Sequence, residues 1–103
     1  FRLRYAGAYG DPNPPRIAAL GYDGTALAAV LANRATSGGA SVAAVRVFQP
    51  QDLTDPDGFA GVDGIFRFGD DGVVQRGLAV LKVSTQGPEL LEEAPTDFDQ
   101  ALF

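Results

Sequence analysis

Acidic residues in a glycine-rich segment are the first candidates for chemistry. Asp63, Asp70 and Asp71 lie within residues 58–72, and carboxylate oxygens close to glycine are the raw material of calcium loops. A calcium loop requires about five to seven spaced oxygen ligands and a distal Glu, and this segment lacks that order. We therefore interpret residues 69–72 as a hairpin turn, and the sequence predicts no metal site.

Three glycines in the same segment, Gly58, Gly61 and Gly64, superficially resemble a phosphate-binding loop. Such a loop runs from a strand into a helix, whose N-terminus binds the anion, whereas this segment runs from a loop into a strand. We expect instead that the glycines let the chain pass close to another element. Phe59 would then fill an apolar pocket.

Carboxylate pairs of the kind used in hydrolysis do not converge in this sequence. Glu92 and Glu93 are neighbours in a possible strand, so they point to opposite faces and cannot act on one bond. Asp97 and Asp99 are expected in a solvated tail. Lys82 stands alone in a strand, and no basic partner is discernible for a serine nucleophile. We predict no catalytic residue and no enzymatic activity.

Two residue pairs could contact a ligand. Tyr22 and Asp23 are neighbours on a predicted helix and point about 100° apart, which favours Tyr22 as a core ring. Arg67 and Arg76 flank the hairpin turn and could form an anion-binding pair, although pairing with nearby carboxylates is commoner. The ligand-binding residues therefore stay unknown at this point.

Composition sets further bounds. The 103 residues include no Cys, His, Met or Trp, which excludes zinc sites of the usual ligands, disulfides and imidazole bases. The hydrophobic content of 46% is that of an ordinary globular chain of one small domain. The net charge of −5, with dispersed basic residues, makes nucleic acid an unsuitable partner. No cofactor is predicted.

The strongest predicted element is a helix over residues 16–33. Its apolar residues follow a three-four spacing, from which we expect a buried face. Gly21 and Gly24 suggest that another backbone comes close to this face. The residues of the predicted buried face are Ile17, Leu20, Gly24, Leu27 and Leu31.

The remaining elements follow from periodicity and turn residues. Residues 1–9 are predicted as a helix ending at Gly10, residues 11–15 and 33–40 as connectors, and residues 41–48 and 50–54 as short helical segments. Residues 55–64 are predicted as a loop, residues 65–68, 73–84 and 89–93 as strands, and residues 69–72 and 85–88 as turns. The tail would be anchored by Phe98 or Phe103.

These elements give an α+β fold within the chain, part of the α/β class. The expected organisation is mainly helical over residues 1–57, a small β-meander over residues 58–95 and a tail over residues 96–103.

Three stretches resemble the C-terminal part of the type I periplasmic binding proteins, the family of branched-chain amino acid receptors and penicillin-binding-protein activators. No single stretch is diagnostic, but their order and spacing make chance an unlikely source of the resemblance. The stretches are PRIAALGYD at 15–23, GFAGVDG at 58–64 with the strand and turn behind it, and RGLAVLKV at 76–83, followed by Ala94 and Pro95.

The resemblance implies a two-lobe periplasmic-binding-protein fold that closes on a small ligand. It implies a non-catalytic substrate-binding component of an ABC importer for amino acids or similar small polar solutes, with an ABC permease as partner. The alternative is a lipoprotein similar to the penicillin-binding-protein activators, which regulates a peptidoglycan synthase by protein contact. Either protein would be periplasmic or otherwise extracytoplasmic, with a lipid anchor at a missing N-terminus as one option.

The chain begins at Phe1 and not at an initiator Met. Together with the resemblance, this predicts the C-terminal portion of a longer protein, whose main ligand contacts come from earlier residues. The alanines of the main helix bury little area, and its two glycines raise the entropy cost of ordering the backbone. We therefore also expect an incomplete fold that requires other polypeptide for burial. Self-association of the chain is one way to supply it.

Overall fold

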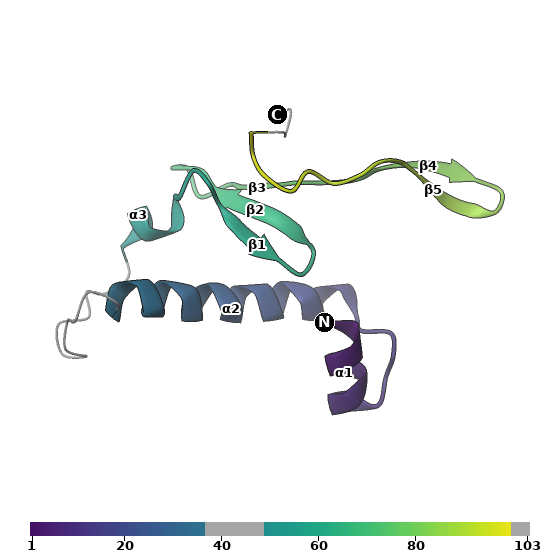
Figure 1. Cartoon of the computed structure of the whole chain (residues 1–103), viewed down its shortest axis with the longest axis horizontal. Coiled ribbons are helices and arrows are strands. Elements are labelled where there is room, and N and C mark those ends of the chain that lie inside the picture. Colours follow the sequence, from purple (N-terminus) through teal and green to yellow (C-terminus); the bar gives the residue numbers. More distant parts are fainter. Residues whose placement is uncertain (37–48, 100–103) are drawn as a thin grey trace. The chain divides into compact units, whose positions relative to one another are not determined.

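The computed structural model describes residues 1–36 and 49–99, and the chain divides into two compact units (Figure 1). The first unit spans residues 1–49 and the second spans residues 50–103. Both long helices belong to the first unit, and all the strands of the described residues belong to the second. The helix expected over residues 41–48 and the anchor expected at Phe103 lie outside the described residues.

Helix α1 (Arg2–Tyr9) ends as the sequence predicts. Gly10 adopts the left-handed conformation with φ 71°, and its N–H donates to the carbonyl oxygen of Ala6 at 2.8 Å. A left-handed residue directly after the last turn stops a helix, and glycine adopts it without strain. The connector over residues 11–15 follows, as expected.

Helix α2 (Arg16–Thr36) begins where predicted and continues beyond the expected end at residue 33. Gly21 and Gly24 both lie inside it, yet a Cβ built on either would meet no atom within 4 Å. No other backbone among the described residues therefore comes close to either glycine.

The buried face of α2 matches the predicted one at Leu31 only and otherwise differs from it. Ala19, Asp23 and Leu31 are buried, whereas Ile17 is 75% exposed and Leu20 is 47% exposed. Asp23 is four positions after Ala19, and Leu31 is eight positions after Asp23 with the half-buried Leu27 between them, so these residues form one stripe along the helix. Alanine and leucine occur around most of α2, so the apolar pattern could not select one face.

The second unit opens with the short helix α3 (Pro50–Leu53), which confirms the predicted helical turn there. A three-stranded antiparallel sheet follows in the order β1 (Phe59–Gly61), β2 (Gly64–Phe68) and β3 (Val74–Arg76). The sheet is thus a meander of consecutive strands.

Strand β1 occupies part of the predicted loop over residues 55–64. Its pairing of Gly61 with Gly64 leaves only Val62 and Asp63 in the turn, so β1 and β2 form a tight hairpin. Tight hairpins contain the same glycine and aspartate residues as open loops, which explains the error.

The turn at residues 69–72 is confirmed. The N–H of Gly72 donates to the carbonyl oxygen of Gly69 at 2.9 Å, and Gly72 has a φ of 78°. Asp71 stabilises the turn because its Oδ1 accepts the N–H of Val73 at 3.0 Å. This carboxylate therefore has the turn role proposed from the sequence.

The predicted strand over residues 73–84 is interrupted. It divides into β3 and β4 (Val80–Ser84), and β4 pairs with β5 (Gly87–Glu92) in a separate two-stranded hairpin. The third strand and the turn before it are confirmed, but the single meander expected over residues 58–95 is two sheets.

Gly77 explains the interruption. Its N–H donates to the carbonyl oxygen of Ile65 at 3.0 Å, and a Cβ at this position would lie 2.8 Å from Cγ1 of Ile65 and 3.0 Å from Cγ of Pro95. The chain therefore passes very close to β2 and to the C-terminal segment here. Sequence composition does not report such a close approach.

The core of the second unit consists of Ile65, Phe66 and Phe98, all of them buried. Gly58 has a φ of 70°, and its backbone lies against this core. A Cβ built on it would lie 2.5 Å from Cε2 of Phe98 and 2.6 Å from the carbonyl oxygen of Phe66. The expected close passage is thus confirmed at Gly58, and Phe98 is confirmed as the anchor of the tail.

Arg67 connects three segments of the second unit. Its Nε donates to Oε1 of Gln75 at 2.8 Å, and its Nη1 donates to the carbonyl oxygen of Pro56 at 3.0 Å. Its Cζ lies 4.4 Å from the centroid of the Phe98 ring, within cation–π range. One side chain therefore ties β3, the segment before β1 and the tail to β2.

The glycine at position 58 should be the least replaceable in the turns of this unit. We expect Gly58→Ala to lower the free energy of unfolding by about 3 kcal/mol, because it combines a strained backbone with an overlap in the core. Gly72→Ala is the matched control, since its φ is also positive but its Cβ would meet nothing within 4 Å. Urea unfolding of the whole chain, followed by the β2 amide signals, measures both, and equal losses would contradict the close passage.

Arg67 should contribute more to stability than Arg76. We expect Arg67→Met to cost about 1 to 2 kcal/mol, since it removes two hydrogen bonds and a cation–π contact while keeping the apolar stem. Arg76→Met is the control, because Arg76 lies 5.1 Å from the Phe66 ring centroid on the other face. A larger loss for Arg76→Met in the same unfolding experiment would refute this ranking.

Candidate functional site

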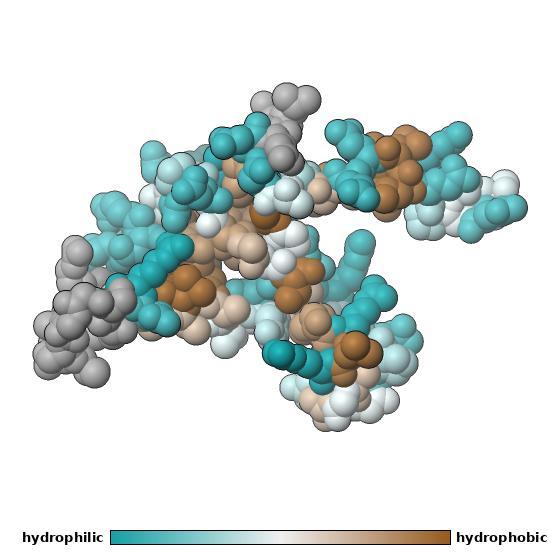
Figure 2. All heavy atoms as spheres, viewed as in Figure 1, coloured by the Kyte–Doolittle hydropathy of each residue, from teal (hydrophilic) through white to brown (hydrophobic). Residues whose placement is uncertain are grey.

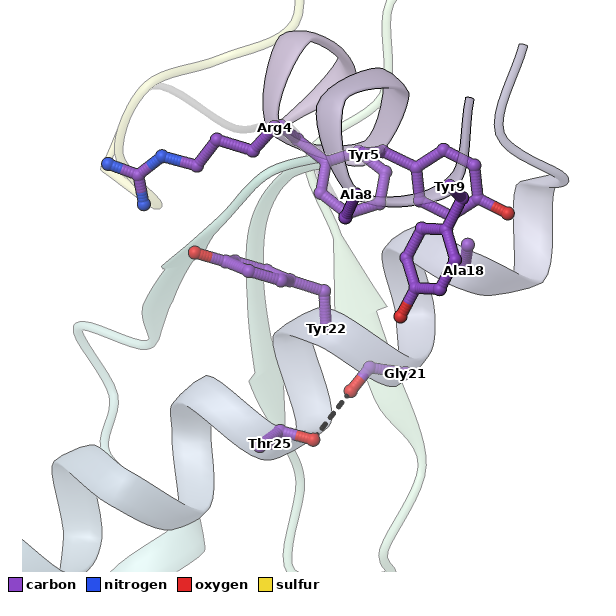
Figure 3. Close-up of a pocket in the computed structure, with 9 residues that line it drawn as sticks. Arg4, Tyr5, Ala8, Tyr9, Ala18, Gly21, Tyr22 and Thr25 are labelled. Carbon is purple, nitrogen blue, oxygen red and sulfur yellow. Dashed lines mark hydrogen bonds between the residues drawn. The ribbon is translucent and has the colours of Figure 1, made fainter. Parts of the chain in front are cut away.

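A groove lined by aromatic rings lies between α1 and α2 in the first unit (Figure 3). Its volume is about 450 Å³, which is within the range of about 300 to 1,000 Å³ that small-molecule sites occupy. The lining residues are Phe1, Arg4, Tyr5, Ala8, Tyr9, Ala18, Gly21, Tyr22 and Thr25.

The rings of the first helix follow from its periodicity. Phe1, Tyr5 and Tyr9 are four residues apart, and this spacing places successive side chains on one face of a helix. The ring centroids of Phe1 and Tyr5 are 5.9 Å apart, and those of Tyr5 and Tyr9 are 4.7 Å apart. The three rings therefore form one aromatic wall.

Helix α2 supplies the opposite wall through Tyr22. Its ring meets that of Phe1 edge-on, with centroids 5.3 Å apart and an interplanar angle of 62°. Edge-to-face contacts of this kind are favourable beyond the area that they bury. The Phe1 and Tyr22 rings thus hold one end of α1 against α2.

Small residues of α2 form the floor between the two walls. Ala18, Gly21 and Thr25 recur at helical spacing, and Gly21 has open space where a side chain would begin. The hydroxyl of Thr25 donates to the carbonyl oxygen of Gly21 at 2.9 Å (Figure 3). Since this hydroxyl is occupied by the backbone, the floor is largely apolar.

Among the described residues that line the groove, Arg4 is the one with a charged side chain, and none is acidic. In Figure 3 its guanidinium group and the hydroxyl end of Tyr22 extend to the same side of the groove. Tyr9 is 73% exposed and Tyr22 is 44% exposed, so both rings are open to solvent. The groove is a cationic, aromatic surface on a chain of net charge −5.

The structure corrects the interpretation of Tyr22 and keeps it apart from Asp23. Tyr22 is an exposed groove residue and not a core ring, while Asp23 is buried and does not line the groove. Adjacent helical residues point about 100° apart, which is why the two diverge.

The three aspartates of the glycine-rich segment are not assembled into a site. Asp63 lies in the turn before β2, whereas Asp70 and Asp71 lie in the turn after it, at the opposite end of the strand. Among residues 1–36 and 49–99, no three acidic residues, with or without His or Cys, come together as a potential metal site. The segment functions as two hairpin turns.

The glycines at 58, 61 and 64 lie in and beside a β-hairpin, so no helix N-terminus follows them. Phe59 packs against the core ring of Phe66, with centroids 5.7 Å apart.

Arg67 and Arg76 do not form an anion-binding pair. In the register of β2 and β3, Phe66 is opposite Arg76 and Arg67 is opposite Gln75. Consecutive pairs in a ladder point to opposite faces of the sheet. The two guanidinium groups are consequently on different faces, over Phe66 and over Phe98.

Hairpin β4–β5 presents a second candidate surface. Leu81 is opposite Leu90, and Val83 is opposite Pro88, which places these four apolar residues on one face. The intervening pair, Lys82 and Glu89, belongs to the other face. Figure 2 shows hydrophobic residues gathered at this hairpin between hydrophilic ones.

The apolar face of the hairpin is open to solvent. Val83 is 91% exposed, and Leu81 and Leu90 are each more than half exposed. Exposed apolar groups that lie side by side mark interaction surfaces more often than scattered ones do. Glu92 and Glu93, at the end of β5, are exposed, as are Asp97 and Asp99 in the tail.

Sequence reasoning missed the aromatic groove. The helix over residues 1–9 was predicted, but its ring spacing was used only to identify a helix. The sequence did contain a signal for the groove. Rings recur every four residues on the first helix, and a lone Tyr22 lies among small residues on the next helix. This signal becomes informative only when the two helices are known to be neighbours.

None of the helices in the described parts of the chain is long and apolar enough to cross a membrane. Comparison with known proteins gives no match for the chain: no family model, no curated protein and no solved structure is similar to it.

Proposed function

We propose that this chain belongs to a non-catalytic, extracytoplasmic ligand-binding protein of the type I periplasmic kind. Such a protein serves an ABC importer for amino acids or similar small polar solutes. The proposed location is the periplasm, and the proposed partners are a small solute and an ABC permease.

The observation that carries this proposal is the aromatic groove between α1 and α2. Its walls are rings, its floor is apolar, and Arg4 contributes the one charged side chain of the described lining. Rings and a fixed cation bind and orient a small molecule, since they supply stacking surface and a directed charge. These features suit a protein that binds a small solute.

The three resembling stretches are the sequence basis of this proposal. The stretch at 15–23 opens α2, the stretch at 58–64 contains β1 and the turn before β2, and the stretch at 76–83 runs from the end of β3 into β4.

A second candidate function is favoured by the apolar face of hairpin β4–β5. An exposed amphipathic hairpin can dock on another protein, as would be required of a penicillin-binding-protein activator that regulates cell-wall synthesis by contact. Under this alternative the partner is a peptidoglycan synthase and no small solute is required.

The two functions differ in what stabilises the protein. For a transport receptor, we expect the full-length gene product that carries this sequence to melt at a higher temperature with one or more amino acids present, because a ligand that binds only the folded state stabilises it. Differential scanning calorimetry with the amino acids, branched-chain members first, measures the shift. A melting temperature unchanged by all of them would refute the receptor proposal.

For an activator, immobilised full-length gene product should retain a membrane-extracted peptidoglycan synthase. We expect Val83→Ser to reduce the retained amount severalfold, because it removes apolar area from the docking face. Lys82→Ser on the opposite face of the same strand is the matched control and should leave retention unchanged. Equal retention by both variants would exclude the hairpin as the docking face.

A further inference from the structure

We propose that the aromatic groove of the first unit selects planar aromatic carboxylates, with the ring between the walls and the carboxylate on Arg4. This inference deepens the proposed function and rests on it in one respect, namely that the chain binds small solutes. The argument uses the shape, the charge and the openness of the groove.

The shape of the groove suits a flat ligand. The wall on α1 consists of Tyr5 and Tyr9 with Phe1, and Tyr22 faces it from α2. Gly21 leaves open space on the floor between the walls. Rings that line a groove offer offset or edge contacts to a further ring, which are the preferred geometries of aromatic pairs.

The charge of the groove selects against cations. Tyrosine faces alone attract ammonium groups, so a groove of rings with an acidic residue would favour a cationic ligand. Here the lining, as far as residues 1–36 and 49–99 supply it, carries the guanidinium of Arg4 and no carboxylate. Arginine presents paired N–H donors that match the two oxygens of a carboxylate, and it repels a cation.

The position of Arg4 also suits this assignment. Arg4 directly precedes Tyr5 in α1, and in Figure 3 its guanidinium extends beside the hydroxyl end of Tyr22, at the edge of the groove. A ligand ring on the apolar floor would therefore direct a short acidic side chain outward to this edge. An aromatic ring with a carboxylate one or two bonds away satisfies both requirements.

Three matched probes test the selectivity on the whole chain: indole-3-acetate, its neutral amide and the cation tryptamine. They share one ring system and differ in charge, so two-dimensional amide NMR titrations separate stacking from charge recognition. We expect indole-3-acetate to bind most tightly and to shift the amide signals of Gly21 and Tyr22. Equal affinity for all three, preference for tryptamine or absence of shifts at the groove would each overturn the proposal.

Arg4→Gln should weaken the binding of indole-3-acetate by about tenfold, since a charge-assisted hydrogen bond is lost, and should leave the amide unaffected. Arg2→Gln is the matched control, because Arg2 is on the same helix, is exposed and does not line the groove. An equal loss in both variants would indicate a general effect of net charge and would contradict the assignment of Arg4.

Filling the floor gives a test that does not depend on charge. Gly21→Leu places a side chain in the groove and should abolish binding of both the acid and the amide. Gly24→Leu is its control, because it makes the same change on the same helix, also in open space, outside the lining. If Gly21→Leu binds as well as Gly24→Leu does, the groove is not the site.

The outcomes also separate this inference from the proposed function. If amino acids shift the melting temperature of the full-length gene product while the unsubstituted chain binds no probe at the groove, the proposed function stands and this inference fails. If the probes bind at the groove and no amino acid gives a shift, the inference stands and the amino acid receptor is excluded.

Discussion

The edge-on contact between Phe1 and Tyr22 is the interaction on which the candidate site depends. It joins the start of α1 to the first half of α2, and the other rings of α1 follow because they repeat every four residues from Phe1. A helix of eight residues has little stability of its own. The groove therefore exists because aromatic packing, and not helix propensity, fixes α1 against its neighbour.

The second unit depends on the same physics in a different form. In its core the ring of Phe98 lies against the backbone of Gly58, and the guanidinium of Arg67 lies over the same ring. Only a residue without Cβ allows this approach, and only an extended cation with a planar head joins three segments at once. In both units, therefore, contacts to an aromatic ring hold neighbouring segments together.

The sequence predicted local features well where one residue type had one explanation. Gly10 after Tyr9 ends a helix, and Gly69 to Gly72 makes a hairpin turn, because positive φ is stable there for glycine. It failed where the answer depended on distant residues. Three features depend on contacts with residues distant in the sequence: the buried face of α2, strand β1 at Phe59–Gly61 and the break at Gly77. The groove likewise depends on two helices being neighbours.

Exposure is the property that connects the fold to the proposed role. Tyr9, Tyr22 and Val83 are large side chains that the described residues leave open to solvent, although each lies in a regular element. Burying such side chains would stabilise the chain, at about 25 cal/mol for each Å² of apolar surface. Their exposure is thus a standing source of free energy for association. In the aromatic groove, the rings and the charge of Arg4 favour association with flat, acidic solutes. On hairpin β4–β5, the uncharged apolar face favours association with polypeptide.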